Sequence, residues 1–224
     1  MKSWRAFLET VNLLALAIWL GTVVVAPVCV VRVFMTMEKL SPRLDAYAQY
    51  GGEHWRLAAG QVGNGVFLIT DIIQFVSALL AGLSFAGLVV IRAANPRRRS
   101  TWVRGLGLSV AMASLMGMML IVVPSLNARF RKYWDAAAAG KTEVAQHWQA
   151  EAAKLHPTSE KLVGLTVVAV LASLTAGAWS LAKSAGDAGD DRADMFQGRE
   201  GSTPGLSSNG PITSRLAVAA CLAR

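Results

Sequence analysis

Residues 11–31, VNLLALAIWLGTVVVAPVCVV, form an apolar block that contains no charged side chain. At ~1.5 Å of rise per residue, a helix over this block spans the ~30 Å hydrocarbon core of a bilayer. A cleavable signal peptide has a shorter apolar region, about 7–15 residues, and ends at a small-residue cleavage site, which is not seen here. The block therefore predicts a retained membrane-spanning helix that bends near Pro27.

Three more apolar blocks of similar length follow, at residues 72–91, 105–126 and 162–182. None of them keeps the charged face of an amphipathic helix from a soluble protein. The whole chain is 54% hydrophobic and only 16% charged, whereas a soluble domain has about 25% charged residues. The expected fold is an all-α, integral membrane four-helix bundle.

We expect the four helices at about residues 8–34, 66–92, 104–128 and 160–183, in a transmembrane domain of residues 1–183. The link at residues 92–104 carries five arginines and no acidic residue, which predicts a cytoplasmic position. An even number of crossings then places both termini in the cytoplasm. Residues 184–224 are rich in Gly, Asp and Ser in their first part, and we predict a disordered cytoplasmic tail.

The two longer connections, residues 32–65 and 127–160, are expected on the outer side. Ser41-Pro42 is a helix-start signal, and Gly140 is expected to interrupt a helix that continues outward from the third block. Trp55, Tyr133, Trp134 and Trp148 are typical of interfacial aromatics. We predict short amphipathic helices on the outer leaflet.

The net charge of +8 is interpreted as membrane topology, with the lipid bilayer and not nucleic acid as the partner. No phosphate-binding loop, dinucleotide fingerprint, nucleophile elbow or zinc-protease motif occurs, so a non-enzymatic protein is expected. The three histidines (His54, His147 and His156) all lie in the outer connections. A transmembrane haem needs histidines inside the helices, and no cofactor is expected.

Polar and ionisable residues inside or beside the membrane are functional candidates because they are costly there. Asp71 lies at the outer start of the second block, three residues before Gln74, and could pair with Arg32 or Arg129. Asn12 is expected to form a hydrogen bond between helices.

Small residues recur at four-residue spacing in three blocks, and such stripes let membrane helices pack closely. The stripes are Ala78, Gly82 and Ala86; Ser109, Ala113 and Gly117; and Ala169, Ser173 and Gly177.

Metal handling on the outer side is the alternative function. Glu143, His147 and Glu151 repeat every four residues, with His156 nearby, and such ligands bind divalent ions. Met112, Met116 and Met119 share a helix face, and thioethers bind copper(I). Exposed acid–base stripes and packed methionines also occur without any metal.

Two short stretches resemble a four-helix membrane family of unknown function, which includes bacterial proteins and the eukaryotic transmembrane protein linked to cisplatin resistance. The first is Trp19-Leu20-Gly21 with Val25-Ala26-Pro27. The second is Val123-Pro124 with Asn127 and Arg129, followed by Leu155-His156 and Ser159. Valines follow the Trp-Leu-Gly where the family has phenylalanines, and an alanine precedes Lys154-Leu155-His156 where the family often has phenylalanine. The resemblance covers roughly residues 5–183 and draws attention to Arg129, His156 and Ser159.

The function expected from the sequence is that of a small transport, stress-resistance or accessory subunit. The expected location is a cell membrane of the bacterial inner-membrane type. Because four helices are few for an independent transporter, a homo-oligomer or a larger membrane complex is expected.

Overall fold

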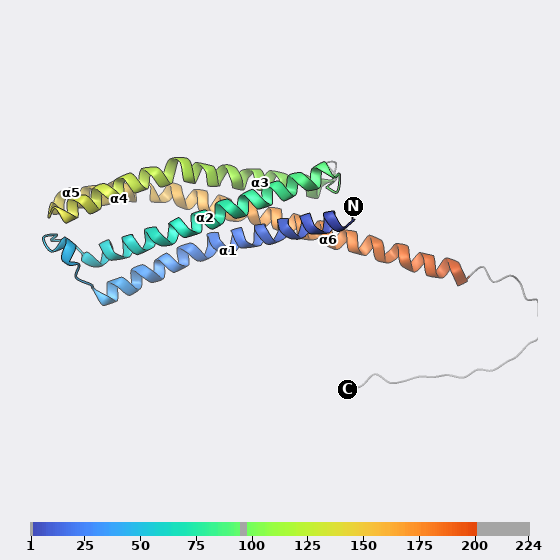
Figure 1. The fold of residues 1–224 in the computed structure, drawn as a ribbon, viewed down its shortest axis with the longest axis horizontal. Coiled ribbons are helices and arrows are strands. Elements are labelled where there is room, and N and C mark those ends of the chain that lie inside the picture. The colour runs from blue at the N-terminus through green and yellow to red at the C-terminus, as the bar shows by residue number, and fades with distance from the viewer. Residues whose placement is uncertain (1, 95–97, 201–224) are drawn as a thin grey trace, which may run out of the picture. The chain divides into compact units, whose positions relative to one another are not determined.

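A computed structural model describes residues 2–94 and 98–200, and its elements in this part are almost all helices (Figure 1). No strand occurs in the described residues. The helices are α1 (Lys2–Leu40), α2 (His54–Val90), α3 (Arg99–Gly117), α4 (Val123–Ala138), α5 (Thr142–Ala153) and α6 (His156–Glu200). Two short elements join them, the 3₁₀ helix η1 (Asp45–Tyr47) and the π-helical turn η2 (Met118–Val122). The predicted all-α class is confirmed.

Four helical runs are long and apolar enough to cross a membrane, as the apolar blocks predict. They are Ser3–Leu40, His54–Val90, Arg99–Ala138 and Thr142–Lys183. Each run is longer than its apolar block because the helix continues into the polar sequence beyond at least one end of the block. The third run joins α3, η2 and α4 through Pro124, and the fourth joins α5 to α6.

The bundle lies within residues 1–183, and residues 184–224 form a separate unit. The described part of the second unit, residues 184–200, continues α6 as helix, whereas its composition predicts disorder. Two features favour this helix. The stretch contains alanines as well as Gly, Asp and Ser, and extending an existing helix avoids the free-energy cost of nucleating a new one. Residues 201–224, also predicted to be disordered, lie outside the described residues.

The connection between α1 and α2 differs from its prediction. Ser41-Pro42 does not begin a helix, because Ser41 has a φ of 41° and ends α1. Its backbone N–H donates to Met37 O, and its hydroxyl donates to Glu38 O. Gly140 interrupts the helix between α4 and α5 as predicted, with a φ of 67° that favours glycine.

Two hydrophobic clusters lie at different heights of the bundle. The larger cluster is centred on Leu16, Trp19 and Val170, and includes side chains from all four runs. The smaller cluster includes Tyr50, Leu57 and Tyr133, and packs the connection after α1 against α4 and α5. We call the end that contains the α2–α3 turn the Arg104 end, and the opposite end the Gly140 end (Figure 1).

The small-residue stripes have different places in the packing. Ala169, Ser173 and Gly177 are buried, so the stripe on α6 faces the interior as predicted. The stripe on α3 does not, because Ser109 and Ala113 are exposed. The interior face of α3 is instead formed by Leu108, Ala111, Ser114 and Leu115. A spacing of four residues identifies a helix face, and only the neighbouring helices decide whether that face is covered.

Candidate functional site

Arg104 is buried inside the bundle, with 3% of its surface exposed. Its Nη2 atom donates a hydrogen bond to Oε2 of Glu9 at 2.8 Å, and Glu9 is 5% exposed. The guanidinium also lies over the ring of Phe85, 5.5 Å from its centroid. Every other ion pair between described residues has at least one exposed side chain. Arg104 and Glu9 thus form a desolvated pair between α1 and α3.

Asn12 connects this pair to α2. Its Oδ1 accepts hydrogen bonds from Nε and Nη2 of Arg104, at 3.2 and 2.7 Å. Its Nδ2 donates to Ala81 O at 2.7 Å and to the hydroxyl of Ser84 at 3.1 Å. Because arginine can only donate, the amide oxygen must face Arg104, which fixes the orientation of the Asn12 side chain. The predicted hydrogen bond of Asn12 between helices is confirmed.

Ser173 connects α6 to the same place. Its hydroxyl lies 3.1 Å from Arg104 O and 3.0 Å from Ala169 O, within hydrogen-bonding distance of both carbonyls. The close approach depends on Gly107, where a Cβ would lie 2.5 Å from Ser173 Oγ and 2.8 Å from Ala169 O. Helices α1, α2, α3 and α6 therefore all contact one polar group of residues, Glu9, Asn12, Ser84, Arg104 and Ser173, which we call the buried network.

The buried network fixes the alignment of the four runs. Removing two charges from water costs several kcal/mol per ion, and that cost is offset only when the geometry is good and the remaining donors are bonded. Here Arg104 bonds to both Glu9 and Asn12. A shift of one helix by a turn, about 5.4 Å, would separate these partners and leave a charge unpaired.

The sequence pattern alone does not identify Arg104 and Glu9 as a site. Arg104 belongs to the basic link that predicts orientation, and Glu9 lies just before the first apolar block. One available signal was the spacing of Glu9 and Asn12, which lie three residues apart on one face of α1. Leu16 and Trp19 continue that face as fully buried side chains. The partner of an acid on an inward face could not be named without the tertiary structure.

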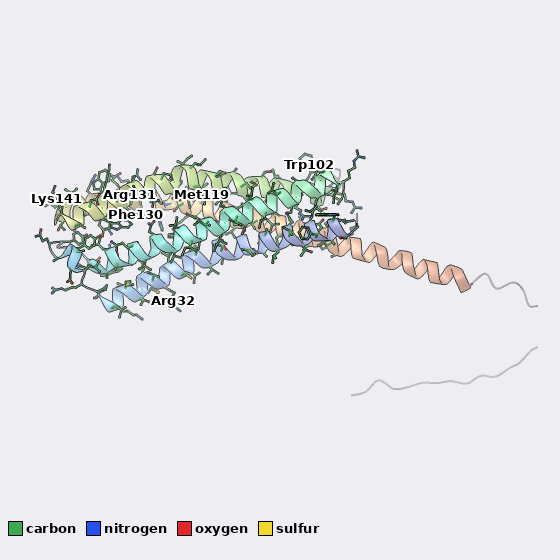
Figure 2. The ribbon with its side chains drawn as sticks, in the orientation of Figure 1. Arg32, Trp102, Met119, Phe130, Arg131 and Lys141 are labelled. Atoms are coloured by element: carbon green, nitrogen blue, oxygen red, sulfur yellow. The ribbon has the colours of Figure 1, made fainter. Side chains whose placement is uncertain are left out.

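Asp71 pairs with neither of its predicted partners. Arg32 is exposed, and its neighbours Val30 and Phe34 lie against Gly63, eight residues before Asp71 on α2. Arg129 turns toward α5, where its Nη1 donates to Glu151 O at 3.0 Å. In Figure 2, Arg32 lies on the α1 side of the bundle and Arg131 on the α4 side. No hydrogen bond or ion pair reaches Asp71 from the described residues, and the same holds for Gln74.

His156 and Ser159 lie at the start of α6, where their side chains interact with neighbouring residues of that helix. The Ser159 hydroxyl donates to His156 O at 2.7 Å. His156 Nε2 lies 3.4 Å from Glu160 Oε1, and both side chains are largely exposed. This arrangement stabilises the start of α6.

The three candidate metal ligands remain on one helix without forming a site. Glu143 and His147 are exposed, and His147 packs edge-on against Trp148. Glu151 pairs with Lys154. Within the described residues, no three side chains of His, Cys, Asp and Glu come together in a way that could hold a metal ion.

His54 organises the connection at the Gly140 end. Its Nδ1 accepts a hydrogen bond from the Leu44 N–H at 3.1 Å, so its Nε2 carries the proton and donates to Tyr50 O at 3.1 Å. An open hollow of about 550 Å³ lies beside it, with Arg43 and Asp45 in its lining. His54 therefore supports the backbone of this loop.

Comparison with known proteins adds nothing on function to the geometry described above. No protein-family model, no curated protein and no solved structure matches the chain.

Proposed function

We propose that this chain is a non-enzymatic, multi-pass membrane protein that works as a small transport or accessory subunit. Its location would be a cell membrane of the bacterial inner-membrane type, with the Arg104 end and both termini in the cytoplasm. Four apolar runs support the membrane location. The basic residues at the α2–α3 turn, including the exposed Arg92, Arg98 and Arg99, support the orientation.

The buried network is the observation that carries the proposed function. Charged side chains within or beside the apolar part of a membrane helix are rare, and they mark ion or substrate pathways more often than simple packing. Arg104 and Glu9 lie on the bundle axis and not on the lipid-facing surface. Within the described residues, no three side chains of His, Cys, Asp and Glu come together to hold a metal ion, which favours transport over metal-dependent catalysis.

Assembly with other chains belongs to the same proposal. Apolar side chains are exposed along the outer faces of the runs, including Leu14, Ile18, Leu83 and Val168. Lipid covers such faces in a monomer, and a second copy or a partner subunit covers them in a complex. The resemblance to the four-helix family stays part of the proposal.

The orientation can be tested by cysteine labelling in intact cells. Cys29 and Cys221 are replaced by serine, and a single cysteine is placed at Arg98 or at Ala138, which lies exposed at the Gly140 end. We expect an impermeant maleimide to label Ala138→Cys and to label Arg98→Cys only after the cells are opened. Labelling of Arg98→Cys in intact cells would contradict the orientation.

The transport or accessory role can be tested on the purified full chain. In proteoliposomes on a solid-supported membrane, we expect charge movement when an ion gradient is applied, and a loss of that signal in Glu9→Gln. Arg98→Gln, an exposed change at the same end, should keep the signal. In parallel, cross-linking in native membranes should recover a stable homo-oligomer or a partner subunit. A silent, monomeric protein in both assays would contradict the proposed role.

A further inference from the structure

Three exposed tryptophans lie at the Arg104 end of the bundle. Trp4, Trp102 and Trp179 belong to α1, α3 and α6 and are 67%, 70% and 71% exposed. Trp4 lies near the start of α1, and Trp102 lies two residues before Arg104. A Cβ on Gly177 would lie 3.5 Å from Cζ of Arg104, so Trp179 lies about half a turn beyond that height. Exposed tryptophans on several membrane helices at one end mark the interface between the apolar core and water.

One face of α3 carries a cation, a tryptophan and an apolar side chain in that order. Arg99 is the first residue of the helix and is exposed. Trp102 follows three residues later, and Leu106, which is 65% exposed, follows four residues after Trp102. Residues at this spacing share a helix face. From the Arg104 end inward, this face has the same order as a phospholipid, which has a charged headgroup, a glycerol region and acyl chains.

The same face continues with small side chains toward the middle of the bundle. Ser109 and Ala113 follow Leu106 at helical spacing, and both are exposed. Small residues let a neighbouring group lie close to the helix backbone. In Figure 2, Trp102 lies at the Arg104 end, where this face begins. An acyl chain can therefore extend from the level of Trp102 along α3.

Arg92 adds a second cation at the same end. Its φ of 56° ends α2, and its backbone N–H donates to Val89 O at 3.0 Å. A Cβ on Gly105 would lie 3.3 Å from Cε1 of Phe85, which aligns the antiparallel helices α2 and α3. Seven residues from that contact toward the turn, Arg92 lies within about one residue of the height of Arg99. The two arginines thus flank the α2–α3 turn at one level.

The charge of these arginines is not neutralised by acidic side chains nearby. Residues 92–104 contain no acid. Among the side chains that the structure describes, neither Arg92 nor Arg99 has an ion pair. At the Gly140 end, by contrast, Arg56 pairs with Glu53. Because a guanidinium binds phosphate oxygens with two parallel N–H donors, the turn is suited to a phosphate group.

We propose that the α2–α3 turn binds an anionic phospholipid of the adjacent leaflet, with its phosphate held between Arg92 and Arg99. The ring of Trp102 lies at the level of the glycerol region, and an acyl chain lies along the face that begins at Leu106. This inference rests on the proposed membrane location and adds a lipid partner with a defined place on the bundle.

The charges favour an anionic headgroup over a zwitterionic one. A choline or ethanolamine headgroup brings its own cation beside the two arginines, whereas a glycerol headgroup leaves the negative charge of the phosphate uncompensated. Basic residues next to a membrane attract anionic lipids for this reason. A soluble anion would use the arginines without using the apolar face below Trp102, so the combination favours a lipid.

Native mass spectrometry of the purified full chain in detergent tests the lipid class. The probes are dioleoyl phosphatidylglycerol and dioleoyl phosphatidylcholine, which differ only in their headgroups. We expect the anionic lipid to bind at least about tenfold more tightly, and the Arg92→Gln, Arg99→Gln variant to lose this preference. Arg98, the N-cap of α3, is left unchanged.

The matched control removes two exposed cations from the Gly140 end. Arg131→Gln, Lys141→Gln has the same change in net charge, and both residues are exposed (Figure 2). We expect this variant to keep the preference for the anionic lipid. Equal binding of the two lipids, or an equal loss in the control variant, would overturn the proposal. Displacement of the lipid by inorganic phosphate would also overturn it, because that result indicates a site for a soluble anion.

Quenching by a brominated lipid tests the position of the site. The protein is placed in phosphatidylcholine vesicles that contain a small fraction of brominated phosphatidylglycerol. The signal of Trp102 is the difference between the wild type and Trp102→Phe, and Trp179→Phe gives the control for an equally exposed ring on α6. We expect stronger quenching of Trp102 than of Trp179, and no such difference in the Arg92→Gln, Arg99→Gln variant. Equal quenching of the two rings would overturn the position.

A second copy of the chain is the other occupant that this face of α3 would accept. Efficient disulfide cross-linking of Trp102→Cys between two copies in native membranes would overturn the lipid proposal, whereas we expect the variant to stay monomeric at this face. These outcomes are separate from the orientation test at Arg98. Lipid binding is measured in detergent, so a reversed orientation would leave it intact, and a failure to bind lipid would leave the orientation intact.

Discussion

Nη2 of Arg104 lies 2.8 Å from Oε2 of Glu9, a residue 95 positions earlier in the chain. The two side chains are 4% and 7% exposed. Breaking a buried pair leaves one charge without compensation, which costs about 3–5 kcal/mol. We therefore expect Arg104→Met to lower the melting temperature in detergent strongly, while Arg98→Met, at an exposed position, leaves it nearly unchanged.

The double variant Glu9→Met, Arg104→Met tests whether the two charges are energetically coupled. Replacing both charges by apolar groups removes the desolvation cost together with the attraction, and such replacements are often neutral. We expect the double variant to melt well above either single variant. If the decrease in melting temperature of the double variant equals the sum of the decreases of the two single variants, the coupling is contradicted.

Gly107 should be intolerant of even one added methyl group. A Cβ there meets Ala169 O at 2.8 Å, and this backbone atom cannot move without shifting α6. Overpacking of this kind costs about 1–3 kcal/mol. Gly117→Ala is the matched control on the same helix, because a Cβ at Gly117 meets nothing within 4 Å. We expect the melting temperature to fall for Gly107→Ala and to change little or rise slightly for Gly117→Ala.

His54→Ala should loosen the connection between α1 and α2. The change removes the acceptor of the Leu44 N–H and the donor to Tyr50 O, each worth about 0.5–1.5 kcal/mol. Hydrogen exchange should become faster at Leu44 and its neighbours, while α1 keeps its protection. His147→Ala, which changes an exposed ring, should leave exchange in this loop unaltered.

Gly140→Ala should destabilise the junction between α4 and α5. The φ of 67° is unfavourable for alanine by roughly 1–2 kcal/mol, and the new Cβ would lie 3.0 Å from Gln49 Cβ. Gly140→Asn should cost less at the backbone because asparagine tolerates this region better. Limited proteolysis near residue 140 is the measurement, and equal cleavage of the two variants would contradict the backbone argument.

The four helical runs can be predicted from the sequence, because the length of an apolar block and its interruption by charge, proline or glycine are local properties. Residues 11–31 and Gly140 could be interpreted without knowing what packs against them. Which polar residues meet depends on how the helices pack. Approximate height along the helices predicts that Asp71 could pair with Arg32 or Arg129, yet eight residues of α2 separate Asp71 from the height of Arg32, and Arg129 turns toward α5. Glu9 and Arg104 meet because helices from distant parts of the chain pack in one alignment, and the energy of a buried pair depends on that alignment to within a helical turn.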